Sequence, residues 1–95
     1  MKHAIQIEKE AAQWMRTSLK VRQAGAKTTA GKAIFEQLWL VPHLTEAAMD
    51  AAINTLVPLV KGDAGQADLD DLRDCVKQFK RILADQARER ERINA

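Results

Sequence analysis

Apolar residues recur at helical spacing along four segments of the chain. Intervals of three and four residues place side chains on one face of an α-helix, which turns once every 3.6 residues or so. The pattern predicts helices over about residues 3–24, 30–40, 45–56 and 68–83. Their apolar faces are predicted to consist of Ile7, Ala11, Trp14, Ser18 and Val21, then Ile34, Leu38 and Val41, then Met49, Ile53, Leu56 and Val60, and finally Leu69, Leu72, Val76, Phe79 and Leu83.

Residues that begin or end helices stand between these segments. Gly25 is predicted to end the first helix, because glycine favours the conformation that follows a helix C-terminus. Pro42 and Pro58 are predicted to end the second and third. Residues 61–66, with two glycines, are predicted to form an exposed turn. The predicted N-terminal caps are Thr28 or Thr29, Thr45 and Asp68.

The four segments predict an all-α fold, a four-helix bundle-like domain with two long outer helices and two short inner ones. Residues 1–95 are expected to form a single domain, which is close to the usual size. Sixteen alanines and the absence of tyrosine also favour helices over sheets. After Leu83 the apolar pattern ends and residues 84–95 are mostly charged, so this end is predicted to be a projecting or frayed helix end.

The cysteine content and the hydropathy of the sequence indicate the cellular compartment in which the protein is expected. Cys75 is the only cysteine, so no disulfide can form within the chain, and a reducing compartment is expected. The first residues lack the apolar core of a signal peptide, and no run of about 18 apolar residues occurs. The sequence therefore predicts a cytoplasmic protein without a membrane span.

Phosphate- and metal-binding motifs are incomplete. The segment 25–33 contains glycines and Lys32 but has Ala33 where a nucleotide-binding loop needs a hydroxyl for Mg²⁺, and its glycines are spaced too widely. His3 and His43 are far apart, and no cluster of Cys and His occurs. His43 and Glu46 would supply only two ligands. We therefore expect no bound metal, no cofactor and no small-molecule substrate.

Nucleophilic catalysis would require Cys75 or a serine such as Ser18. Cys75 stands between Asp74 and Val76, beside the apolar face of the last helix. Burial and acidic neighbours both raise the pKa of a thiol, so Cys75 is predicted to be unreactive. No set of nucleophile, base and orienting group is evident. The sequence predicts a protein that is not an enzyme.

The lengths of the predicted helices favour association with a protein partner. A helix of about 22 residues is roughly 33 Å long, whereas one of about 11 residues spans half of that. The long apolar faces would extend past the short helices, so a homodimer or a groove for a partner helix is predicted. Trp14 and Trp39 are predicted to be core residues, and either one would indicate an interface if exposed. The predicted partner-binding residues are Met15, Leu19, Phe79, Leu83, Arg88, Arg90 and Arg92.

Nucleic-acid binding is the alternative, and it depends on how the charge is distributed. Residues 1–32 carry a net charge of +5, residues 33–76 one of −6 and residues 77–95 one of +3. This segregation also suits the ends folding back on the middle, or two copies associating. The third predicted helix has acidic side chains and no Lys or Arg, so it would repel DNA. The predicted contacts are therefore to the phosphate backbone, through Arg16, Lys20, Arg22, Lys27 and Lys32.

Overall fold

The computed structural model describes the backbone of residues 4–94 and the side chains of residues 9–89 and 91. The elements are α1 (Ala4–Ala24), α2 (Thr29–Trp39), α3 (Glu46–Leu56), the 3₁₀ turn η1 (Val57–Leu59) and α4 (Gly62–Asn94). The all-α, four-helix prediction is confirmed, and within 4–94 no strand is present. Four side chains named in the sequence analysis, those of His3, Ile7, Arg90 and Arg92, lie outside the described residues.

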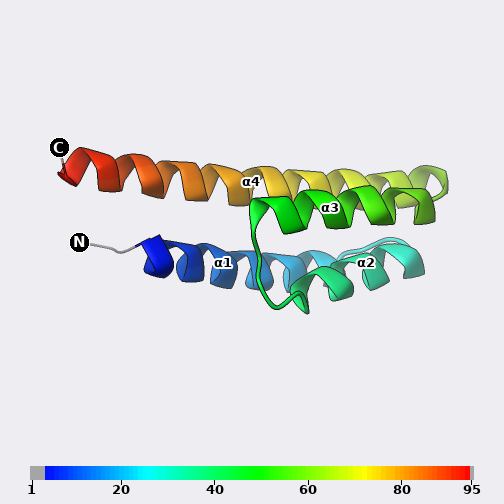
Figure 1. The fold of residues 1–95 in the computed structure, drawn as a ribbon. Helices are drawn as coiled ribbons and strands as arrows, with labels where there is room; N and C mark the ends of the chain where they lie inside the picture. The colour runs from blue at the N-terminus through cyan, green and yellow to red at the C-terminus, as the bar shows by residue number, and fades with distance from the viewer. Residues whose placement is uncertain (1–3, 95) are drawn as a thin grey trace.

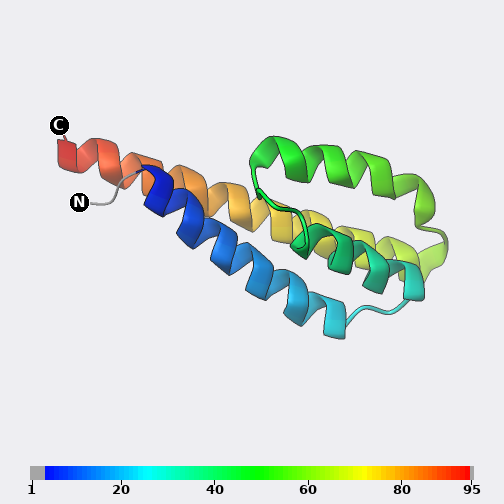
Figure 2. The same ribbon diagram turned by 60° about the horizontal axis from the view of Figure 1, so that its bottom comes forward.

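The two long helices form the frame of the molecule. α1 and α4 run antiparallel along its length, while α2 and α3 lie side by side over one end (Figures 1 and 2). At the other end α1 and α4 continue together beyond the short helices (Figure 2). The described chain measures 49 × 20 × 18 Å. The prediction that two long helices outreach two short ones is therefore confirmed.

Local sequence explains most helix boundaries. The Thr28 side chain accepts a hydrogen bond from the Gly31 N–H and caps α2, while Thr45 accepts one from the Ala48 N–H and caps α3. α2 ends at Trp39, three residues before Pro42. α3 ends at Leu56, and the chain tightens into η1 at Pro58, as a ring without an N–H requires.

The start of α4 differs from the prediction. Residues 61–66 do not form an exposed turn, because α4 begins at Gly62 and includes the buried Gly65. Gly62 adopts a φ of 80°, a left-handed conformation that glycine tolerates best, and this lets the chain reverse from η1 into α4. Gly65 lies against Val60, where a Cβ would come within 2.8 Å of the valine Cγ1. Gly62 therefore allows a tight reversal of the chain, and Gly65 allows Val60 to approach the helix backbone closely.

The core lies between all four helices. Its largest fully buried side chains are Met15, Leu19, Phe35, Leu38, Met49, Leu72, Cys75 and Phe79. The face of α1 is rotated from the predicted one, because α1 packs against both α2 and α4 and the row Ala11–Met15–Leu19 lies between them. Val21, predicted to lie on the apolar face, is 68% exposed, and Trp14 is half-buried.

Asp68 was predicted to cap its own helix, but this prediction is wrong. Its side chain instead binds the start of α2. It is the buried charged residue of the described core, and its carboxylate accepts hydrogen bonds from the Lys27 N–H (2.9 Å), the Thr28 N–H (3.0 Å) and the Thr28 hydroxyl (2.7 Å). Burial alone would raise the pKa of this carboxyl, but the hydrogen bonds together outweigh it and hold the pKa below its ordinary value. The α1–α2 connection is thereby fixed to α4.

A carboxyl whose pKa is lowered by folding stabilises the protein above its unfolded pKa. That contribution is lost as the pH falls through the folded pKa, here below about pH 4. We expect Asp68→Asn to lower the free energy of unfolding by about 2 kcal/mol at neutral pH, because a neutral amide accepts hydrogen bonds more weakly than the Asp68 carboxylate does. The difference in free energy of unfolding between this variant and the wild type should be smaller at acidic pH. Urea unfolding of both proteins at about pH 7 and pH 3 measures it, and an equal difference at both values would contradict the assignment.

Candidate functional site

The predicted partner-binding residues do not form one surface. Met15, Leu19 and Phe79 are fully buried, so the expectation that they lie on an exposed face is wrong. They belong to the core cluster, to which all four helices contribute. Leu83 is half-buried against the core. Arg88 is exposed and donates a hydrogen bond of 2.7 Å to Asp85. Arg90 and Arg92 are not described.

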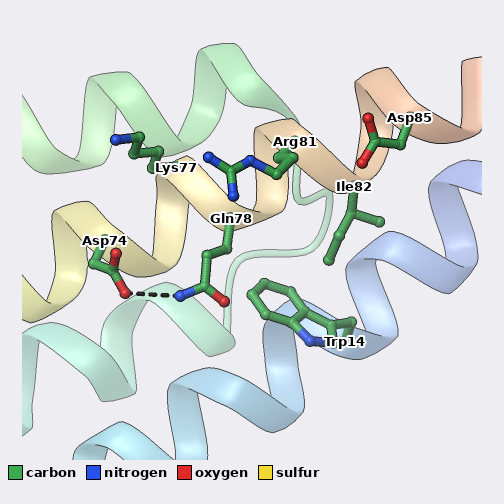
Figure 3. A pocket seen from close by; sticks show the side chains of 7 residues that line it. All are labelled: Trp14, Asp74, Lys77, Gln78, Arg81, Ile82 and Asp85. Atoms are coloured by element: carbon green, nitrogen blue, oxygen red, sulfur yellow. Dashed lines mark hydrogen bonds between the residues drawn. The ribbon is translucent and has the colours of Figure 1, made fainter. Parts of the chain in front are cut away.

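Trp14 and Trp39, both predicted to be core residues, are each half-buried and pack against the core. A shallow groove lies between α1 and α4, lined by Trp14 from α1 and by α4 residues Asp74, Lys77, Gln78, Arg81, Ile82 and Asp85 (Figure 3). The α4 residues recur at intervals of three, four and one, so they share one side of the helix. We call this the Trp14 groove.

An apolar centre and a charged rim characterise the Trp14 groove. Trp14 and Ile82 come from different helices and are each half-buried, so each exposes part of its apolar surface (Figure 3). The Gln78 side chain donates a hydrogen bond of 2.8 Å to Asp74 across one helical turn. Lys77 and Arg81 stand beside these residues on the exposed surface of α4. The Trp14 groove therefore combines one aromatic and one aliphatic residue, each half-buried, with charged and polar groups.

A network of charges adjoins the Trp14 groove. Arg22 donates hydrogen bonds to Asp71 and to Asp74, the latter at 3.4 Å, and to Ser18 at 3.1 Å. These contacts fix α1 to α4 near one end of the groove. They also place Arg22 inside the molecule, where its side chain is 18% exposed. Arg22 was predicted to contact phosphates, and this charge is instead paired with two carboxylates.

The other predicted phosphate contacts are also divided among different tasks. Arg16 is partly buried and donates hydrogen bonds to the carbonyls of Trp39, Val41 (2.7 Å) and Pro42 (3.2 Å), which caps the end of α2. The Lys20 ammonium lies 4.2 Å from the centre of the Trp39 ring, a cation–π contact. Lys27 and Lys32 are exposed. Of the predicted set, Arg16 and Arg22 thus have partners within the fold, whereas Lys20, Lys27 and Lys32 are exposed.

Cys75 is buried in the core beside α1. Its Sγ lies 3.5 Å from Met15 Sδ and 3.4 Å from Ser18 Oγ. Burial raises the pKa of this thiol, and Asp71 and Asp74 raise it further, which exceeds the lowering effect of Ser18 and Arg22. The predicted direction of the shift is confirmed. Among the described residues, no three His, Cys, Asp or Glu side chains gather closely enough to hold a metal ion.

Comparison with known proteins gives no match: no family model, no curated protein and no solved structure matches this chain. A separate finding concerns membranes: within the described part of the chain, every helix is too short or too polar to cross a bilayer. The functional interpretation consequently depends on the geometry of the chain itself.

The residues of the Trp14 groove other than Trp14 were not predicted from the sequence. The periodicity of α4 indicates which side is apolar, but the groove lies at the edge of that side, where Ile82 meets Gln78 and Arg81. Only the position of α1 shows that this edge adjoins Trp14. A signal was present in the sequence for Trp14 alone, since tryptophan is a frequent interface residue.

Proposed function

We propose that the protein is a small non-catalytic helical module that acts by binding another protein chain through the Trp14 groove. The observation that carries this proposal is the partial exposure of Trp14 beside Ile82, in the groove where α1 and α4 meet. Tryptophan at the centre of a polar rim is a common contributor to binding energy at interfaces. The partner surface that fits is an amphipathic helix with a narrow apolar stripe.

Self-association remains one form of this proposal, because a second copy is a protein chain with amphipathic helices of its own. The joint extension of α1 and α4 beyond α2 and α3 supports it, since helices that project as a pair leave a face available for two more. Nucleic-acid binding is less well supported, because Arg22, one of the predicted phosphate contacts, is paired with Asp71 and Asp74.

A photoreactive side chain at Lys77 tests the proposed groove. Lys77 is exposed and lines the groove, so replacement should not disturb the core. We expect irradiation in cells to join it covalently to one defined protein, a second copy included. The same group at Asn54, exposed on α3, is the matched control and should give no such product.

The identified partner must then bind the purified wild-type protein. Arg81→Glu, within the groove, should weaken this binding about tenfold, because a rim charge is reversed. Lys61→Glu makes the same kind of change at an exposed site between η1 and α4 and should have no effect. Equal products from the positions of Lys77 and Asn54, or equal affinities of the two charge-reversed variants, would contradict the proposal.

A further inference from the structure

A second groove lies on the opposite flank of α1. It runs between α1 and the segment that joins α2 to α3, and it is lined chiefly by Lys9, Ala12, Arg16, Pro42, His43 and Leu44. Its volume is about 670 Å³, which is within the range of sites that hold a peptide side chain or two. We call this the Pro42 groove, and it shares no lining residue with the Trp14 groove.

Arg16 fixes one wall of the Pro42 groove. Its guanidinium donates hydrogen bonds to the carbonyls of Trp39, Val41 and Pro42, and thereby fixes the chain after α2 against α1. Carbonyl oxygens carry only partial negative charge, so most of the positive charge of Arg16 remains uncompensated. The arginine is therefore held in a defined place with a charge that a carboxylate could neutralise.

The remaining lining of the Pro42 groove is basic, apolar or, at Gln13 and Thr45, polar without charge. Lys9 and His43 are exposed, and none of the described side chains that line the groove is acidic. Leu44 is 7% exposed, Ala12 is half-buried and Pro42 is exposed, so together they supply an apolar floor. A ligand that matches both properties carries negative charge and a small amount of apolar surface.

The positions of Lys9 and Arg16 along α1 indicate the length of that ligand. Their backbone positions are seven residues apart, two helical turns or roughly 10 Å along the helix axis. In a polyproline II segment, residues about three apart share a side and are separated by roughly 9 Å. Two carboxylates at that spacing could approach Lys9 and Arg16 together.

We propose that the Pro42 groove binds an extended acidic peptide segment of a partner protein. One carboxylate pairs with Lys9, another approaches Arg16 and the imidazole of His43, and an apolar side chain contacts Ala12 and Pro42. A nucleic acid fits less well, because its affinity comes from many phosphate contacts, whereas the described residues that line this groove include two full cations. The inference goes beyond the Trp14 groove and is independent of it.

Calorimetric titration of the full chain with synthetic peptides tests this site. The probe is a short proline-rich peptide with leucine and two aspartates about three residues apart. We expect it to bind, and the same peptide with asparagine at both positions to bind at least about tenfold more weakly. Lys9→Glu and His43→Glu should each weaken binding of the acidic peptide about tenfold, whereas Lys61→Glu, outside the groove, should leave it unchanged.

Several outcomes would overturn the inference. Equal affinity for the acidic and amide peptides would remove the role of charge, and tighter binding of oligothymidylate would assign the surface to nucleic acid. No binding of the acidic peptide to wild-type protein with an unchanged circular dichroism spectrum would also overturn it. Crosslinking from Lys77 tests the Trp14 groove separately, so either site can fail without the other.

Discussion

Replacing Phe79 with alanine is expected to lower the free energy of unfolding by about 3–5 kcal/mol. Phe79 is fully buried in the core, which includes residues of all four helices. Its removal would leave a cavity that the surrounding helices cannot fill without moving. Because small domains have only about 5–15 kcal/mol of stability in all, the variant should be close to unfolded at physiological temperature.

Urea unfolding followed by circular dichroism measures this effect. Leu59→Ala is the control, because Leu59 is 60% exposed and its truncation should change the stability by less than about 0.5 kcal/mol. If Phe79→Ala retained nearly wild-type stability but lost a binding partner, the original prediction of an interface role would be restored and the core assignment rejected.

Gly31→Ala is expected to be destabilising by roughly 2–3 kcal/mol, against the ordinary preference of helices for alanine. Gly31 lies in the first turn of α2, where a Cβ would stand 2.6 Å from Cγ and 2.9 Å from Cβ of Asp68. These atoms belong to a buried side chain that is held by Lys27 and Thr28 and cannot move aside freely. The substitution should therefore break the contact that joins the α1–α2 connection to α4.

Gly25→Ala provides a matched control in the same connection. A Cβ at Gly25 would meet only the Arg22 carbonyl oxygen, at an ordinary distance of 3.7 Å, and the backbone there is not left-handed. We expect a change within about 1 kcal/mol for this variant. Thermal unfolding of both variants gives the comparison, and similar melting temperatures would show that Asp68 does not require the space at Gly31.

Several elements could be predicted from the sequence because their causes are local. Thr28 and Thr45 cap α2 and α3 with their own side chains, and Pro58 acts on its own backbone to end α3. The four apolar segments are similarly local, since each repeats within a single helix. The lengths of these segments also predicted that two helices would outreach the others, as the structure has them.

The candidate grooves could not be predicted in this way. The Trp14 groove joins Trp14 to residues some sixty positions later, and the Pro42 groove joins α1 to the α2–α3 connection. Arg16 and Arg22 show the difficulty most clearly, since both belong to the same basic segment. Arg16 caps α2 through three carbonyls, whereas Arg22 pairs with carboxylates of α4. Nothing in the sequence of the segment distinguishes these two sets of contacts.

The sequence by itself determined the number of helices, the approximate bounds of α1, α2 and α3, and Thr45 as the cap of α3, and it limited the cap of α2 to Thr28 or Thr29. Those features follow from interactions within a few residues, which the order of the amino acids specifies directly. Only the tertiary structure decided that Asp68 serves α2, that Met15 and Phe79 are core, and that Trp14 is half-exposed. Each of these depends on how one helix is rotated and positioned against another, and packing of the whole core fixes that rotation.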